Sequence, residues 1–256
     1  EQFALLEAAA PGRIDLGIGR APGSDPVTSY ALRGTHDDRD IENFPAYLDD
    51  VAALMSTRGV VVPLRSGEYR LKATPAAATE PRMWLLGSSM YSARLAAAKG
   101  LPYVFAHHFS GQGTEEALEL YRSRFVPSEL APEPVTFLTV NAAVAETRDE
   151  ATALMLPNLQ MMARLRTGQP LGPVPLVEEA QVAELTGPQQ HIVESGLERA
   201  VLGTPVEAAE QVRALAKRFG VDEVMVHPVA SARRGTDPRT APARVATLEL
   251  LAKELF

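Results

Sequence analysis

The sequence predicts an α/β fold with parallel strands and helices that cross over between them. Short apolar runs alternate with amphipathic segments along most of the chain, and Gly or Pro marks most junctions. Three consecutive strand–helix units between Met83 and Arg166 have the size that parallel strands with helical crossovers need. Periodicity alone leaves two architectures open, an open doubly wound sheet and part of a (β/α)8 barrel.

The first third of the chain is predicted to contain a helix, a strand, a second helix and a hairpin. Apolar residues at helical spacing run until Pro11, and residues 13–19 then alternate with the period of a strand. An apolar stripe over residues 41–55 predicts a core-facing helix with Pro45 near its start, where a missing N–H is tolerated. We expect residues 60–82 to form a short hairpin or excursion.

The rest of the chain continues the alternation. Gly100 and Gly220 are expected to end two helices, and Thr204 and Pro205 are expected to begin one. A Gly/Pro loop is expected at residues 171–177, within a region that interrupts the alternation as an insertion, 168–200. The further strands are expected at residues 84–86, 101–106, 135–144 and 221–226, and the further helices at 91–99, 114–125, 148–166, 182–197, 205–219 and 241–255.

Composition excludes several classes of chemistry. The absence of cysteine removes thiol nucleophiles, thiolate zinc sites, iron–sulfur clusters and disulfides. A net charge of -7 argues against nucleic acid or anionic lipid as a partner. No apolar run approaches the roughly 18 residues of a membrane span, and no signal peptide is evident. We therefore expect a cytoplasmic protein without a membrane partner. Because the chain opens at Glu1 without a Met, we also expect the start of a longer protein to be missing.

Ligands in both architectures bind at the carboxyl ends of the strands, so the residues that follow each apolar run are the candidates. Gly17, Gly19 and Arg20 close the first strand. The glycines permit close approach of a flat ring or phosphate, and the guanidinium offers phosphate a planar fork. The alternative is a tight turn with a solvated arginine, and the glycine spacing is not that of a dinucleotide fingerprint.

A serine cluster follows the strand at 84–86 and leads into a helix. N–H groups at a helix start, together with the hydroxyls of Ser88, Ser89 and Ser92, favour a phosphomonoester site. An ordinary serine N-cap is the alternative. Because the three serines lie within one short segment, we predict the phosphate site.

His107 and His108 follow the next apolar run and are the candidate catalytic residues. On a continuing strand they would point to opposite faces, which argues against a shared metal ion. One of them could titrate near neutrality, and a structural histidine is the alternative. The other histidines are scattered without metal-ligand spacing, so we predict no metal site. A Gly-x-Ser-x-Gly elbow is also absent, which disfavours a serine triad.

Several segments together carry a family resemblance. They are the opening EQFALL with PGRIDLGIGR up to Arg20, the run WLLGSS from Trp84, LAAAKGLP from Leu95, the helix start LGTP from Leu202, and the run DEVMV from Asp222. In these segments the chain resembles the bacterial luciferase-like monooxygenases, which are flavin-dependent enzymes on a (β/α)8 TIM barrel. The resemblance covers nearly the whole chain and implies a single luciferase-like barrel domain over residues 1–256.

The resemblance implies a site for reduced FMN. Arg20 and the three serines would bind the flavin phosphate, and Tyr91 would contact the phosphate or the ring. The two glycines of the first strand would leave room near the isoalloxazine or the substrate. The implied cofactor-binding residues are Arg20, Gly87, Ser88, Ser89, Met90, Tyr91, Ser92, Gly17 and Gly19.

The implied reaction is the oxygenation of a small organic substrate by reduced FMN and O2. A separate flavin reductase and a homodimer are the expected partners. Three alternatives stay open. One is a hydride-transferring oxidoreductase of the same superfamily that uses a deazaflavin, and another is a non-catalytic flavin-binding protein. The more distant third is a different phosphate-binding barrel enzyme, which would bind sugar phosphates but no flavin. Members of the family begin with three further barrel strands, so the present strands would be the fourth to the eighth. We therefore expect the first three strands to be missing here, or the barrel not to be closed.

Overall fold

The computed structural model describes residues 1–21, 26–33, 42–109 and 111–256. The chain divides into two compact units. The first unit consists of Glu1–Gly23, Tyr30–Phe105 and Glu115–Thr136, and the second of Ser24–Ser29, Ala106–Thr114 and Phe137–Phe256.

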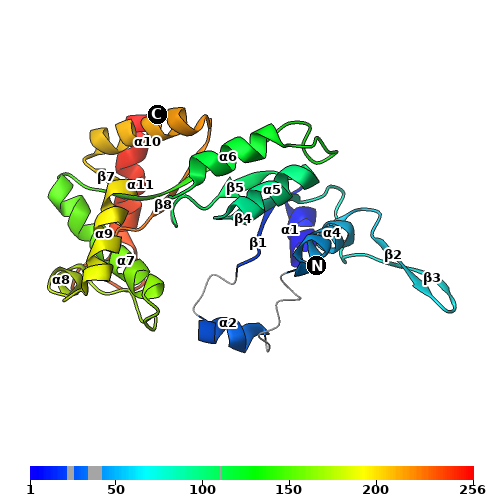
Figure 1. Cartoon of the computed structure of the whole chain (residues 1–256), viewed down its shortest axis with the longest axis horizontal. Coiled ribbons are helices and arrows are strands. Elements are labelled where there is room, and N and C mark those ends of the chain that lie inside the picture. Colours follow the sequence, from blue (N-terminus) through cyan, green and yellow to red (C-terminus); the bar gives the residue numbers. More distant parts are fainter. Residues whose placement is uncertain (22–25, 34–41, 110) are drawn as a thin grey trace. The chain divides into compact units, whose positions relative to one another are not determined.

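A three-stranded parallel sheet forms the centre of the first unit. Its order is β1-β4-β5, and the strands predicted at residues 13–19, 84–86 and 101–106 are confirmed. The elements are α1 (Gln2–Ala9), β1 (Asp15–Gly19), α4 (Phe44–Met55), β4 (Arg82–Gly87), α5 (Met90–Lys99), β5 (Tyr103–Phe105) and α6 (Thr114–Ser123) (Figure 1). The structure adds the helix α2 (Pro26–Arg33), whose eight residues are fewer than the window over which helical periodicity is judged.

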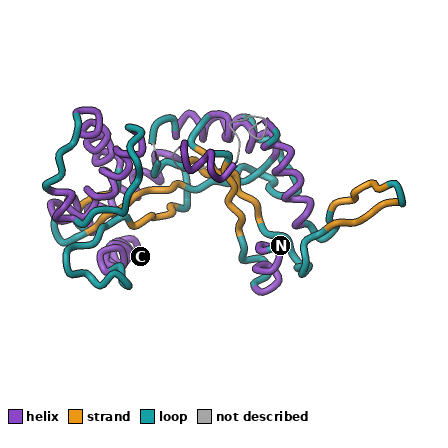
Figure 2. The backbone as a smooth tube through the Cα atoms, turned by 90° about the horizontal axis from the view of Figure 1, so that it is seen from below, coloured by secondary structure: helices purple, strands orange, loops and turns teal. Residues whose placement is uncertain are grey.

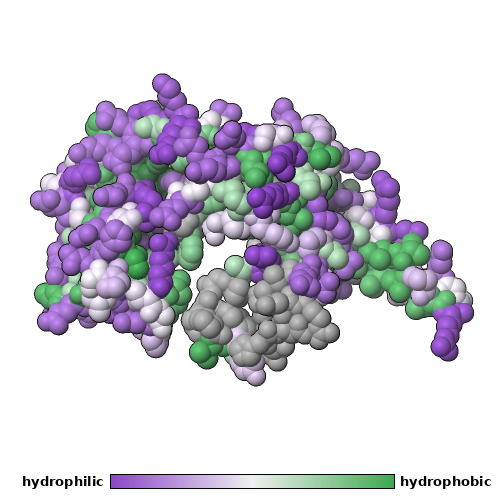
Figure 3. Space-filling model, in the orientation of Figure 1, coloured by the Kyte–Doolittle hydropathy of each residue, from purple (hydrophilic) through white to green (hydrophobic). Residues whose placement is uncertain are grey.

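Between α4 and β4 the chain forms a two-stranded antiparallel hairpin, as predicted. Its strands are β2 (Val60–Leu64) and β3 (Gly67–Leu71), which lie side by side in Figure 1 and Figure 2. Apolar side chains on it are exposed, among them Leu64 at 52% and Tyr69 at 57%. Figure 3 shows this hydrophobic surface along the hairpin. Exposed apolar side chains gathered on one element are typical of a contact surface.

A second three-stranded parallel sheet, with the order β7-β6-β8, forms the centre of the second unit. β6 (Leu138–Val144) and β8 (Val224–Pro228) confirm two predicted strands, and they pair directly. β7 (Val201–Gly203) was not predicted, because three residues are too few for a periodic signal. It pairs only with the end of β6, at Ala142 to Val144.

The helices of the second unit correct one expectation. The helix predicted over residues 182–197 is wrong in its start, because it begins only at Gly187. Residues 182–186 separate it from a shorter helix that ends at Gln181. Pro188 lies in the first turn of the helix that begins at Gly187, where its missing N–H is tolerated. The helices are α7 (Arg148–Arg166), α8 (Val177–Gln181), α9 (Gly187–Arg199), α10 (Pro205–Phe219) and α11 (Pro242–Leu255).

Local sequence sets several helix ends as predicted. Gly100 and Gly220 end α5 and α10 in the left-handed region, with φ of 61° and 59°. Thr204 begins α10 in a capping box: its Oγ1 accepts from the Glu207 N–H, and the Glu207 carboxylate accepts from the Thr204 N–H at 2.9 Å. Helix placement therefore follows from residues close in sequence.

The parallel sheets and their helical connections confirm the α/β class. Among the residues that the structure describes, β1 pairs only with β4, and β8 pairs only with β6. Closure of one barrel domain, and the three strands expected before β1, stay predictions.

We expect Gly100→Ala to lower the free energy of unfolding by about 2 kcal/mol or more. The left-handed conformation costs a residue with a Cβ roughly 1–2 kcal/mol, and this Cβ would also lie 2.5 Å from the carbonyl oxygen of Val126. Gly168→Ala is the matched control, because Gly168 has a φ of 70° with open space around it. Urea unfolding measures both losses. A loss at Gly100 no larger than the loss at Gly168 would contradict the steric argument.

Candidate functional site

The parallel pairing of β1 with β4 brings two predicted groups to one edge of the first sheet. Gly19 pairs with Leu86. The carboxyl ends of β1 and β4 therefore lie side by side, and they are followed by Arg20 and by the loop 88–89. The Arg20 guanidinium lies over the ring of Tyr91 in α5, with Cζ 4.2 Å from the ring centroid. A cation over an aromatic face at this distance is attracted by the ring. The structure thus unites the two motifs that the sequence predicts as phosphate ligands.

Glycines allow the close packing at this edge. A Cβ on Gly17 would lie 2.8 Å from Cδ1 of Leu86, and a Cβ on Gly87 would lie 2.3 Å from Oγ of Ser92. Gly19 is less crowded, because a Cβ there would lie 3.3 Å from the carbonyl oxygen of Leu86. Packing therefore requires glycine at Gly87, beside the buried Ser92, whereas a side chain at Gly17 would displace only the end of the exposed Leu86 side chain. The role of these glycines beside a flavin ring stays a prediction.

The start of α5 presents exposed hydroxyls beside its first N–H groups. Ser89 is the N-cap residue in an extended conformation, and its side chain makes no capping hydrogen bond. Ser88 and Ser89 are exposed, while Met90 is partly buried. Ser92 differs, because its buried Oγ donates to the carbonyl oxygen of Ser89 at 2.7 Å and lies 3.3 Å from the Tyr103 hydroxyl. Ser92 thus supports the loop, whereas Ser88 and Ser89 offer their hydroxyls at the surface.

His107 lies in the turn after β5 and is 8% exposed. Its Nδ1 is 2.8 Å from Oγ1 of Thr114, and its ring meets the ring of Phe219 edge-on. Burial, followed by the charge of Arg199, lowers the pKa of His107 to about 4. The ring is therefore neutral at pH 7, and its contacts are those of a structural histidine.

His108 belongs to a polar network on β6 and β8. The expected opposite orientation of the two adjacent histidines on a continuing strand does not apply, because β5 ends at Phe105 and both lie in the turn that follows. Nδ1 of His108 lies 2.7 Å from Oγ1 of Thr139, and its carbonyl oxygen accepts from Nδ2 of Asn141 at 2.8 Å. Oδ1 of Asn141 lies 3.0 Å from Nδ1 of His227, its register partner. Burial and then the neighbouring His227 lower the pKa of His108.

Sequence reasoning missed this network, although a signal existed. Thr139 and Asn141 occupy alternate positions of an otherwise apolar strand, which places two polar side chains on one face. His227 was grouped with the scattered histidines, because only the pairing of β6 with β8 brings it to Asn141.

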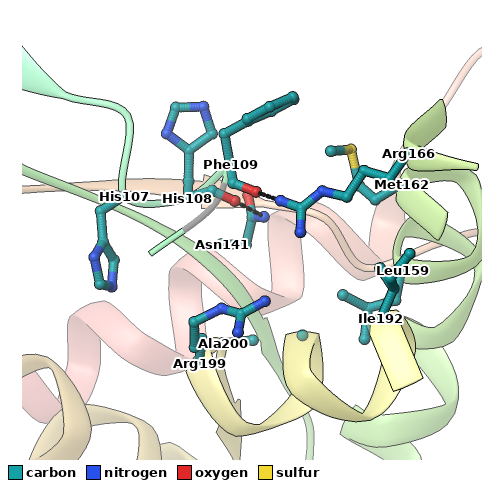
Figure 4. Close-up of a pocket in the computed structure, with 11 residues that line it drawn as sticks. His107, His108, Phe109, Asn141, Leu159, Met162, Arg166, Ile192, Arg199 and Ala200 are labelled. Atoms are coloured by element: carbon teal, nitrogen blue, oxygen red, sulfur yellow. Dashed lines mark hydrogen bonds between the residues drawn. The ribbon is translucent and has the colours of Figure 1, made fainter. Parts of the chain in front are cut away.

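A cavity of about 40 Å³ opens beside this network in the second unit (Figure 4). Arg166 from α7 and Arg199 from α9 point toward it, and Leu159, Met162 and Ile192 provide apolar lining. The volume suits a small group rather than a flavin ring. The sequence did not predict these arginines as site residues, because the packing of two helices brings them together.

The described ranges contain no group of three or more His, Asp or Glu side chains that could hold a metal ion. No helix in those ranges is long and apolar enough to cross a membrane.

We expect protonation of His107 to destabilise the fold below neutral pH. The unfolded residue takes up a proton near pH 6.5, whereas the folded residue does so only near pH 4. Between these values the unfolded state binds more protons, so the free energy of unfolding falls with falling pH, by at most about 1.4 kcal/mol per pH unit. Urea unfolding across this window should give a smaller slope in His107→Gln than in the parent. The exposed His191→Gln is the control, and equal slopes in parent and His107→Gln would refute this assignment.

The chain matches known proteins over most of its length. Residues 1–223 match the family model of luciferase-like monooxygenases. Over 227 residues the chain is 36% identical to a luciferase-like monooxygenase of Escherichia coli K12, covering 89% of this chain and 65% of that protein. Over 228 residues it is 37% identical to the Bacillus subtilis protein YvbT, with the same coverage. The chain thus spans about 65% of the length of these relatives.

Solved structures agree with this match. The crystal structure of apo-MsnO8 is 29% identical, with a TM-score of 0.70 over 99% of this chain and 70% of that one. Two structures share the fold at lower identity. The FMN complex of the oxygenating constituent of 3,6-diketocamphane monooxygenase from Pseudomonas putida is 16% identical (TM-score 0.57, coverage 95% and 70%). An F420-dependent secondary alcohol dehydrogenase is 13% identical (TM-score 0.61, coverage 99% and 73%). A family match of this extent, with two relatives above 30% identity, means that the chain belongs to the luciferase-like monooxygenase family.

Proposed function

We propose that this chain forms part of a flavin-dependent monooxygenase that uses reduced FMN and O2 to oxygenate a small organic substrate. Family membership and the monooxygenase relative in Escherichia coli support an oxygenating enzyme. The observation that carries the cofactor assignment is the contact between Arg20 and Tyr91 at the carboxyl edge of β1 and β4. The activity is proposed for the whole protein, because the chain spans about 65% of its relatives.

The residues at this edge fit the phosphate end of FMN. The guanidinium of Arg20 is a planar fork that pairs with phosphate oxygens in a bidentate manner. Its stacking on Tyr91 holds it near the start of α5, where the first N–H groups and the helix dipole favour an anion. Ser88 and Ser89 add exposed hydroxyls, and the Ser89 side chain is not engaged in capping. We assign these three side chains and the start of α5 to the phosphate.

The ring end of FMN is assigned to the glycines and their neighbours. Gly17 and Gly19 are exposed, so one stretch of the β1 backbone can lie against a flat ring. Met90 and Tyr91 are partly buried beside the same loop, and Gly87 lets Ser92 pack under it. Ser92 supports the loop through its bond to Ser89.

Reduced FMN, when bound, supplies the electrons with which O2 is activated for oxygen transfer. The residues of the chain bind the cofactor, orient it and transfer protons. Arg20 and the serines contribute binding energy far from the reacting atoms. We propose His108 as the proton-transfer residue, because it is exposed and Thr139 occupies its Nδ1, which leaves Nε2 for the proton. Although the residue as a whole is exposed, desolvation of its ring and then the neighbouring His227 lower the pKa of His108, so the imidazole is neutral at pH 7 and can accept a proton.

A deazaflavin-dependent hydride transferase is the second candidate, because an F420-dependent alcohol dehydrogenase has the same fold. Its cofactor would use the same phosphate site. The protein can be incubated with equal amounts of FMN and an 8-hydroxy-5-deazaflavin, desalted, and examined by absorption spectroscopy. Retention of the deazaflavin would favour hydride transfer. Retention of FMN without O2-dependent turnover would favour a flavin-binding protein that is not an enzyme.

The proposed assembly is a cytoplasmic homodimer that receives reduced FMN from a separate flavin reductase. The exposed apolar side chains of β2 and β3 support the hairpin as the subunit contact, with Leu64 and Tyr69 each more than half exposed. Family resemblance supports the reductase.

We expect Arg20→Ala to weaken the binding of reduced FMN at least tenfold, because a charge-assisted phosphate contact is lost. The affinity for reduced riboflavin, which has no phosphate, should change little. Arg94→Ala removes an exposed arginine from α5 and is the matched control. Anaerobic fluorescence titration of each variant measures both affinities. Unchanged FMN affinity in Arg20→Ala would remove the basis for the phosphate site.

A further inference from the structure

Two arginines of the second unit face one cavity without an acidic partner. Arg148, Arg233 and Arg239 each form an ion pair with Glu or Asp in this unit. Among the described residues, neither Arg166 nor Arg199 pairs with a carboxylate. The chain has 32 acidic against 25 basic residues, so acidic groups are not scarce. What sets these two arginines apart is that both line one cavity, Arg166 as an exposed and Arg199 as a half-buried side chain.

Helix packing holds the two arginines at the same cavity. At Gly196, where α9 packs against α7, a Cβ would lie 2.6 Å from Cδ2 of Leu159. Arg199 follows within one turn of α9, and its guanidinium donates to Oγ of Ser195. The lack of a side chain at Gly111 makes room for this arginine, since a Cβ there would lie 2.5 Å from Cδ of Arg199. The position of Arg199 is thus built by close contacts on two sides.

Arg166 comes from the last turn of α7. Its guanidinium donates to the carbonyl oxygen of Phe109 and lies over the Phe109 ring, with Cζ 5.5 Å from the centroid. A guanidinium has five N–H donors, and the contacts described use only part of them in each arginine. In Figure 4 both guanidinium groups point toward the cavity, where further donors can meet a ligand.

Of the described residues that line the cavity, two are arginines and none is acidic. Burial and then the charge of Arg199 lower the pKa of Arg166, as expected for like charges that lie close together. His107 adds no charge at pH 7, because its own pKa is lowered to about 4. Such repulsion is relieved when an anion binds between the two cations.

We infer that this cavity binds the carboxylate of a small organic acid through Arg166 and Arg199. A carboxylate has the planar, two-oxygen geometry that a guanidinium fork matches. The first methylenes of the acid would lie against Leu159, Met162 and Ile192, and the rest of a longer chain would extend out of this small cavity. Inorganic phosphate would satisfy the arginines but leave these apolar side chains uncovered. The inference deepens the proposed function and rests on it only for the role of the acid as substrate.

Binding is tested on the flavin-free protein by ligand-observed NMR titration with acetate, butyrate, hexanoate and hexanamide. Hexanoate should bind saturably, and affinity should rise from acetate to butyrate to hexanoate, by up to about fourfold per buried methylene. The neutral hexanamide should bind at least tenfold more weakly than hexanoate. Equal binding of hexanamide, or phosphate binding as tight as that of hexanoate, would overturn the inference.

Substitutions test the two arginines. Arg166→Gln and Arg199→Gln should each weaken hexanoate binding at least tenfold, while Arg164→Gln, on the same helix but outside the cavity lining, should not. Each of the first two variants should unfold at the same or a higher temperature than the parent, because like-charge repulsion is removed. Parent-like hexanoate affinity in both variants would overturn the inference.

The affinity for reduced FMN, measured in the same samples, separates the two proposals. Hexanoate binding without FMN binding would contradict only the proposed function. FMN binding without hexanoate binding would contradict only the carboxylate site.

Discussion

The close parallel pairing of β1 with β4 is the constraint on which the candidate cofactor site depends. Gly19 is the register partner of Leu86, and the five-residue register from Asp15 to Gly19 holds the two strands in parallel. Because both strands run in the same direction, the residues that follow them emerge at one edge. Arg20 and the start of α5 are therefore neighbours, although about seventy residues of chain separate Arg20 from Tyr91. The elements described within that interval include α2, α4 and the hairpin of β2 and β3, and β1 and β4 pair across them.

A second close approach has a comparable effect in the second unit. Gly196 lets α9 pack against α7, and this contact brings Arg166 and Arg199 to one cavity. The contrast with Arg233 is instructive, since that arginine reaches Glu150 at 2.6 Å and also pairs with Glu178. Arg213 links two helices differently, because it donates to the backbone carbonyl oxygen of Glu254. Arg166 and Arg199 differ from Arg233 in that they line a cavity.

Much of the fold could be predicted from sequence because its signals are local. The helix ends at Gly100 and Gly220 and the capping box at Thr204 depend on residues within a few positions of one another. The strand β7 and the helix α2 could not be predicted, because both segments are too short for a periodic signal. In the candidate site, Arg20 and the serine cluster stood out because they follow apolar runs. The partners of His108 did not, because Asn141 and His227 meet only through strand pairing.

The sequence by itself determined which residues form strands and helices, where several helices begin and end, and which segments resemble the luciferase-like family. It also named the side chains at the strand ends that suit a phosphate. Tertiary structure decided which of them share an edge, that Ser92 faces inward to Ser89 and Tyr103, and that two arginines from separate helices meet at one cavity. The physical reason is the range of the interactions. Helix caps and the periodic pattern of apolar residues depend on residues a few positions apart. Ion pairs and the burial of side chains at a site depend on elements far apart in the chain.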